Sequence, residues 1–164
     1  MKFAASTLLA LAFAGLSSAA AIPQELAQRA GGSSIADVAE VGAKIAEIIL
    51  QGQAADNDVR ERFSQNMVDG FRREYGDNSN IVVIHTGHDY AWDGAQGTDW
   101  NHWHYELDIQ IGGTVGYEMY VSKTSGYLKR TGDGGTINWA WYGFLTEGGA
   151  QEDGSRLNFI DPDA

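Results

Sequence analysis

All four histidines of the 164-residue chain lie within a 20-residue segment: His85, His88, His102 and His104. Histidine is the commonest metal ligand and the side chain that titrates nearest neutral pH. His102, His104 and Glu106 follow one another at intervals of two, so on a β-strand their side chains would project from one face. The four histidines with Glu106 therefore predict a site for a divalent transition metal, whose bound water would be a nucleophile. The alternative is that they are solvated or hydrogen-bonded histidines on the polar face of a strand.

The same segment is rich in tryptophan and aspartate, set among glycines. Indole rings beside carboxylates are typical of sites that stack on sugar rings, because the ring face is apolar and the hydroxyls need acceptors. We predict ligand-binding roles for five residues here: Asp89, Trp92, Asp93, Asp99 and Trp100. The alternative is that the tryptophans belong to the core.

The composition is strongly acidic and lacks cysteine. Without Lys2, 10 basic residues stand against 22 acidic ones, a net charge of −12. This charge disfavours nucleic acids and anionic membranes as partners, because Lys and Arg drive binding to phosphates. It favours cations, metal ions and neutral ligands such as glycans. The lack of cysteine excludes thiol nucleophiles and cysteine-type zinc sites.

The N-terminus predicts export. Lys2 precedes the apolar run 3–16, which is short for a membrane span, and small residues follow at 17–21. This order is typical of a secretory signal peptide over residues 1–21. Residues 22–33 are expected to be flexible or a propeptide that ends at Arg29, and 34–164 to form a single domain. We expect a secreted protein with no membrane span.

Hydrophobic periodicity then predicts the elements that must position the candidate residues. Apolar residues at helical spacing predict a first helix over 34–51. They predict a second helix that is capped by Asp56 or Asn57 and stops at Gly76. Apolar runs, alternation and glycine turns predict strands near 81–85, 102–111, 115–122, 127–130 and 136–145, with an edge strand at 157–160.

Helices followed by a run of strands favour an α+β fold with two N-terminal helices packed on one antiparallel sheet of about five strands. We expect the turn after strand 102–111 at Gly112–Gly113. We expect His88 and Asp89 in a loop, and His85 on a strand beside 102–111.

The chain resembles the small, cysteine-free secreted proteins of filamentous fungi, a family of unassigned function. The resemblance rests on the leader Met-Lys-Phe-Ala-Ala-Ser, the Ala-Ile-Pro junction, and the segments Ile-His-Thr-Gly-His and Asn-His-Trp-His-Tyr-Glu-Leu. It implies export and carries over no catalytic residue.

No complete catalytic motif is present: the sequence has no Gly-x-Ser-x-Gly, phosphate loop or dinucleotide fingerprint. Carboxylate pairs for glycoside hydrolysis can be drawn from Glu106, Asp108 and Glu118, but with 22 acidic residues some pair always fits. We therefore expect a secreted, non-enzymatic binding or effector-like protein whose site at 85–106 takes an extracellular ligand, a glycan or a host protein. The alternatives are a metal-dependent hydrolase or oxidoreductase, and a carbohydrate-binding module that uses Trp92 and Trp100.

Overall fold

The computed structural model describes residues 33–51, 56–109, 113–132, 138–151 and 155–164. The predicted signal peptide, and the predicted propeptide segment up to residue 32, lie outside the described residues. No helix within the described ranges is long and apolar enough to cross a membrane.

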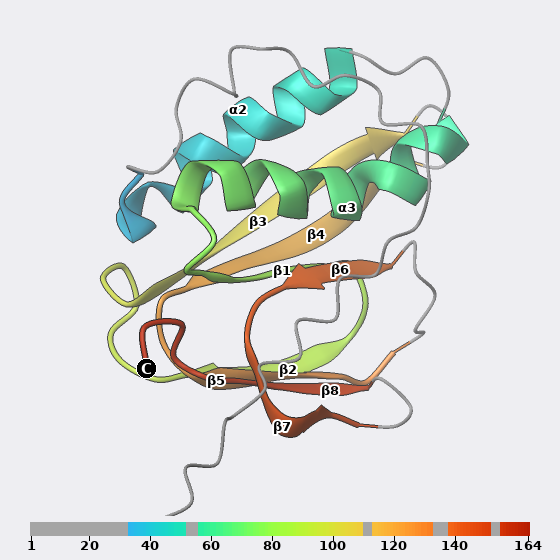
Figure 1. Ribbon diagram of the computed structural model, residues 1–164. Coiled ribbons are helices and arrows are strands. Elements are labelled where there is room, and N and C mark those ends of the chain that lie inside the picture. Colours follow the sequence, from blue (N-terminus) through green and yellow to red (C-terminus); the bar gives the residue numbers. More distant parts are fainter. Residues whose placement is uncertain (1–32, 52–55, 110–112, 133–137, 152–154) are drawn as a thin grey trace, which may run out of the picture.

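The chain folds into three layers, with two helices above one four-stranded sheet and a second four-stranded sheet below it (Figure 1). The α+β class and the two N-terminal helices are confirmed. The prediction of one antiparallel sheet of about five strands is approximately right: in the described part of the chain the strands form two antiparallel sheets of four strands each.

The helical layer begins with a short 3-10 turn η1 (Ile35–Asp37), followed by α2 (Val38–Gln51) and α3 (Asp56–Tyr75). Ser34 caps the first turn, and its hydroxyl accepts a hydrogen bond from the backbone N–H of Ala36. Gly76 ends α3 with a φ of +81°, a conformation that glycine adopts without the strain of a Cβ atom.

The upper sheet has the order β3-β4-β1-β6, with β3 (Trp100–Ile109) and β4 (Gly113–Ser122) forming a long hairpin. β1 (Asn80–Ile84) pairs with β4 on one side and with β6 (Trp139–Tyr142) on the other. β3 is therefore an edge strand, and β4 separates it from β1. This order corrects the expectation that the strand ending at His85 would lie beside β3.

The lower sheet has the order β2-β5-β8-β7, formed by β2 (His88–Trp92), β5 (Gly126–Arg130), β8 (Arg156–Phe159) and β7 (Leu145–Ala150). β2 lies where we expected a loop. β8 pairs on both sides and is not the predicted edge strand. The predicted strand 136–145 is divided between the two sheets: β6 ends at Tyr142 and β7 begins at Leu145, while residues 136 and 137 lie outside the described residues.

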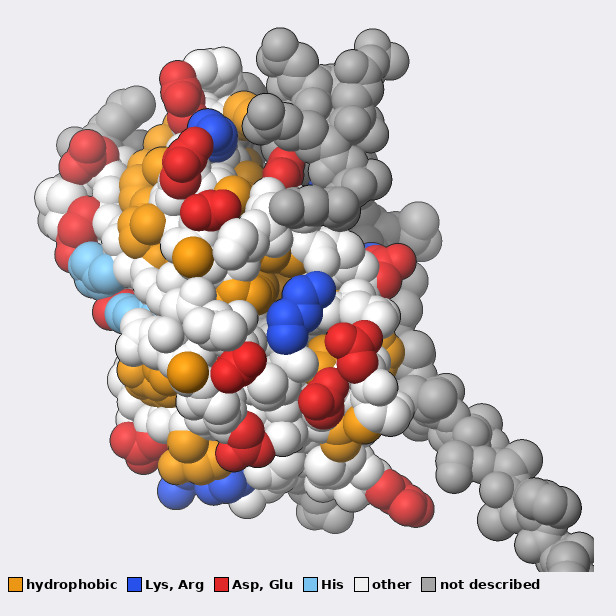
Figure 2. All heavy atoms as spheres, turned by 90° about the vertical axis from the view of Figure 1, so that its left-hand side faces the viewer, with side chains coloured by type: hydrophobic (Ala, Val, Ile, Leu, Met, Phe, Trp, Pro, Cys, Tyr) orange, Lys and Arg blue, Asp and Glu red, His pale blue; other side chains and the backbone are white. Residues whose placement is uncertain are grey.

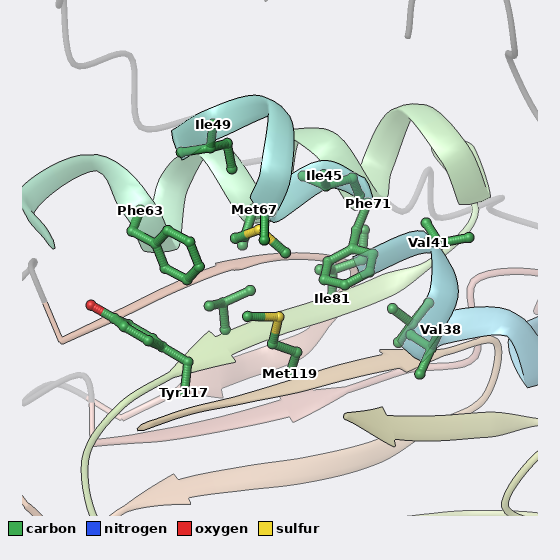
Figure 3. Close-up of a cluster of buried hydrophobic side chains, with 14 of the residues drawn as sticks. Val38, Val41, Ile45, Ile49, Phe63, Met67, Phe71, Ile81, Tyr117 and Met119 are labelled. Atoms are coloured by element: carbon green, nitrogen blue, oxygen red, sulfur yellow. The ribbon is translucent and has the colours of Figure 1, made fainter. Parts of the chain in front are cut away.

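The larger core lies between the helices and the upper sheet (Figure 3). The apolar stripes of both helices meet alternate residues of β1, β3 and β4, as helical and strand periodicities require. Phe63, Met67 and Phe71 from α3 face Tyr117 and Met119 from β4. Because this core takes one face of β3 and β4, the other face is turned toward the lower sheet.

The smaller core lies between the two sheets. Its buried members are Val82, Ile84, Trp92, Tyr120, Leu128, Leu157 and Phe159. The strands of the lower sheet have four to six residues, whereas β3 and β4 have ten each.

Candidate functional site

The predicted alternation of β3 is confirmed. Trp103, Tyr105, Leu107 and Ile109 pack against the helix-side core. His102, His104 and Glu106 consequently project from the opposite face, toward the lower sheet. Antiparallel pairing places His104 opposite Glu118 and His102 opposite Tyr120, so acidic and aromatic residues of β4 join the histidines on this face.

Glu118 is the centre of the polar group. One of its carboxylate oxygens, Oε2, accepts a hydrogen bond from Nε2 of His102. The other, Oε1, lies 2.8 Å from Nδ1 of His104. From the sequence, Glu118 was only one member of possible carboxylate pairs, whereas in the structure it has two histidine partners.

His104 bridges two carboxylates. Its Nε2 lies 2.8 Å from Oε1 of Glu106, and its Nδ1 faces Glu118. A neutral imidazole has one N–H, so both nitrogens donate only when the ring is protonated. A Cβ atom at Gly116 would lie only 3.0 Å from Cε1 of His104. Glycine at position 116 thus lets the ring lie close to the strand.

These contacts shift the pKa values of the group in a consistent direction. Hydrogen bonds from His104 to Glu106 and Glu118 raise the pKa of His104. Hydrogen bonds from Thr114 and His104 lower the pKa of Glu106. Burial alone would raise the pKa of Glu118, but its hydrogen bonds with His102 and His104 outweigh burial and lower it. Both carboxylates are therefore held in the ionised form.

A second polar contact joins the two sheets. His88 of β2 has its Nδ1 2.7 Å from the carbonyl oxygen of Thr86 and its Nε2 2.9 Å from the hydroxyl of Tyr120. The carbonyl can only accept, so Nδ1 carries the proton in the neutral ring, and the Tyr120 hydroxyl donates to Nε2. Burial, with a smaller contribution from Tyr90, raises the pKa of Tyr120 and keeps its phenol protonated.

Tyr90 lies on β2, at the edge where the two sheets meet. It is 39% exposed and is the one exposed large hydrophobic side chain in the described part of the chain. Its ring centroid lies 4.5 Å from that of Tyr120, 6.0 Å from Trp100 and 6.4 Å from His102. The ring thus connects the aromatic side chains of β2 with the histidine-bearing face of β3.

We use the name edge site for seven residues on β2, β3 and β4: His88, Tyr90, His102, His104, Glu106, Glu118 and Tyr120. Both β2 and β3 are edge strands of their sheets, and the ring contacts of Tyr90 with Trp100 and His102 join them, so the site lies at one edge of the sandwich. The side chains of His104 and Glu106 are about half exposed, at 47% and 51%. Figure 2 shows histidine side chains beside acidic ones on the molecular surface.

Of the residues predicted to hold a metal, the structure separates His85 from the rest. The His85 ring lies 5.4 Å from the ring of Tyr117, which belongs to the helix-side core. His102 and His104 project from the opposite face of that sheet. No group of three or more His, Asp or Glu side chains among the described residues is arranged to hold a metal ion.

The predicted ligand-binding residues are divided between structural roles and the surface. Trp92 is 7% exposed and packs in the inter-sheet core. A carboxylate oxygen of Asp99 accepts the backbone N–H of Ala95 at 2.7 Å, and one of Asp93 accepts the Ser125 hydroxyl at 2.5 Å.

Two predicted ligand-binding residues remain beside the edge site. Trp100 is half-buried, with its ring against Tyr90. Asp89 is exposed and lies opposite Lys129 on β5.

Three residues of the edge site were absent from the predicted set: Tyr90, Glu118 and Tyr120. A signal for two of them exists in the alternation of β4. Since Tyr117, Met119 and Val121 share the core face, Glu118 and Tyr120 must share the other one. Tyr90 carries no such signal, because β2 was expected to be a loop.

The arrangement can accept hydrogen bonds through two ionised carboxylates, move a proton at His104, and stack a ligand on Tyr90. Comparisons of the chain with protein-family models, with curated proteins and with solved structures find no match.

Proposed function

We propose that the protein is a secreted, non-enzymatic binding protein that holds a small polar ligand at the edge site. Secretion rests on the N-terminal sequence, with its basic residue, apolar run and small-residue junction. The binding role rests on the side chains that gather at this edge of the sandwich.

The observation that carries the proposal is the position of Tyr90. The one exposed large hydrophobic side chain among the described residues lies next to a network of histidines and carboxylates. Binding sites typically combine an aromatic surface with a few convergent polar groups. An isolated exposed tyrosine would be unremarkable, but this ring adjoins both sheets and the polar network.

The carboxylates favour binding over glycoside hydrolysis. Hydrolysis of that kind requires one carboxylic acid that stays protonated, with a raised pKa, beside an ionised partner. Glu106 and Glu118 both have lowered pKa values. Two ionised carboxylates supply hydrogen-bond acceptors but no carboxylic acid to protonate a leaving group.

The test is a binding screen by NMR on the mature chain, with a library of neutral sugars, amines and carboxylic acids. We expect at least one class of compound to shift the resonances of Tyr90 and the β3 histidines. Tyr90→Ala should weaken binding and so reduce these shifts at a subsaturating concentration of the compound. Tyr127→Ala is the matched control, because Tyr127 alternates with the buried Leu128 on β5 and its ring stacks under Arg156 at 3.9 Å.

The control should keep the shifts. A library that produces no shifts at the edge site, or shifts that Tyr90→Ala leaves as large as before, would show that this surface is not the binding site.

A further inference from the structure

We infer that the ligand of the edge site is an alkylammonium compound that contacts both the Tyr90 ring and the carboxylate of Glu118. The inference rests on the proposed function and names the chemical class of its ligand. Three observations support it: carboxylate oxygens with unused acceptor positions, the negative charge of these carboxylates, and the exposed ring of Tyr90.

The N–H groups identified at the edge site are already engaged. Both ring nitrogens of His104 face carboxylates, and both ring nitrogens of His88 face Thr86 and Tyr120. His102 directs its Nε2 at Glu118.

The carboxylate oxygens still have lone pairs that accept no hydrogen bond within the site. An ionised carboxylate offers about four lone-pair directions. Glu118 uses two of them for His102 and His104. A ligand that complements these groups must therefore bring donors.

Glu106 and Glu118 also have no permanent positive partner among the described residues. Within the described ranges, the ion pairs of Glu106 and Glu118 are formed with His102 and His104 alone. Histidine can lose its charge by titration, whereas Lys and Arg stay charged over the whole ordinary pH range. The lysine and arginine ion pairs of the described residues lie on the helical side, at Lys44–Glu40 and Arg72–Asp77. A ligand cation would supply the missing charge.

The aromatic surface suits the same ligand. Cations are attracted to the face of a tyrosine ring, and a nearby carboxylate adds to this attraction. Tyr90 is exposed, and its ring lies beside His102, the partner of Glu118. An anionic ligand would meet two ionised carboxylates in a chain of net charge −11.

The test compares 1,5-diaminopentane with 1,5-pentanediol, which has the same carbon chain and no charge. Binding to the mature protein is measured by titration calorimetry at pH 7.5 and by NMR shifts of the edge-site residues. We expect the diamine to bind at least tenfold more tightly than the diol, since hydrogen bonds to charged groups are the stronger ones.

Glu118→Gln keeps the shape of the side chain and removes its charge. We expect it to weaken diamine binding about tenfold or more. Glu147→Gln is the matched control, because Glu147 is exposed on β7, at the opposite edge of the lower sheet from β2. The control should leave the affinity unchanged. Tyr90→Leu should weaken diamine binding about two- to fivefold through loss of the ring face.

Three outcomes would overturn the inference. If the diol or a neutral sugar binds as tightly as the diamine, an ammonium group is not required, and the proposed binding function still stands. Equal weakening by Glu147→Gln would assign the attraction to net charge instead of the edge site. If no compound of any class binds at the edge site, the proposed function fails and the inference fails with it.

Discussion

Tyr120→Phe should destabilise the protein although it leaves the core volume almost unchanged. The Tyr120 side chain is 2% exposed and packs between the sheets. Its hydroxyl donates to Nε2 of His88 at 2.9 Å and so ties β4 of the upper sheet to β2 of the lower one. Because phenylalanine keeps the ring, the substitution removes the hydrogen bonds of the hydroxyl with His88 and Tyr90, both on β2, and little else.

The magnitude follows from that loss. A typical intramolecular hydrogen bond contributes about 1 kcal/mol, and a buried acceptor left without a donor adds to the cost. His88 is half-buried, so water can reach part of its ring. We therefore expect the free energy of unfolding to fall by about 1–2 kcal/mol, which corresponds to a drop in Tm of about 3–8 °C for a domain of this size.

The assay is urea unfolding at pH 7, followed by circular dichroism. Tyr142→Phe is the control, because the Tyr142 hydroxyl donates to the carbonyl of Asp77 at 3.2 Å on the surface. The control should cost less than about 0.5 kcal/mol. If Tyr120→Phe costs no more than Tyr142→Phe, the hydroxyl does not hold the sheets together and our account of this contact is wrong.

Three further predictions concern neighbouring features. The folded pKa of His104 lies above its ordinary value of 6.5, so its contribution to stability is complete below pH 6.5 and is lost as the pH rises through the folded pKa. His104→Gln should therefore lower the free energy of unfolding more at pH 5.5 than at pH 9. An equal loss at both pH values would contradict the raised pKa. Glu118→Gln should lower the midpoint of the His104 NMR titration, since it removes a charged acceptor; an unchanged midpoint would argue against the contact. Gly42→Ala should destabilise the fold by about 1–3 kcal/mol in urea unfolding, because a Cβ atom there would lie 2.2 Å from the Trp103 ring, and a neutral substitution would contradict this packing.

The sequence predicted the helical layer and one face of the β3–β4 hairpin well, because both depend on local periodicity. The apolar stripe of α3 is buried at Phe63, Met67 and Phe71, as the four-residue spacing requires. Strict alternation in β3 likewise placed His102 and His104 on one face. Such patterns are fixed by backbone geometry, whatever the neighbouring strands are.

Register could not be predicted so directly. A two-residue turn at Gly112–Gly113 would place His104 opposite Val121, whose side chain lies in the helix-side core. The structure places His104 opposite Glu118, and Gly113 already belongs to β4. A change of three positions in register exchanges the two faces of the partner strand. The pairing of His104 with Glu118 was therefore hidden by an uncertainty at the turn, although the alternation of β4 already placed Glu118 on the polar face.

The division into two sheets was equally hidden from local patterns. β2 is only five residues long, and three of them are exposed, so nothing in its hydrophobicity separates it from a loop. Trp92 was assigned to a loop for the same reason. In the structure its ring centroid lies 5.3 Å from that of Phe159 on β8. Only the non-local docking of one sheet on the other buries Trp92 and brings Tyr90 to the polar face of β3.

This docking has a consequence for function. The carboxylates and two of the histidines come from the upper sheet, whereas Tyr90 and His88 come from the lower one. A ligand that contacts both Tyr90 and Glu118 binds only when the sheets are docked, so it must stabilise that docked state. Tyr120→Phe loosens the same docking without touching a carboxylate. It should therefore weaken binding of an alkylammonium ligand as well as stability, whereas Gly42→Ala, which acts on the helix side of the upper sheet, should reduce stability alone.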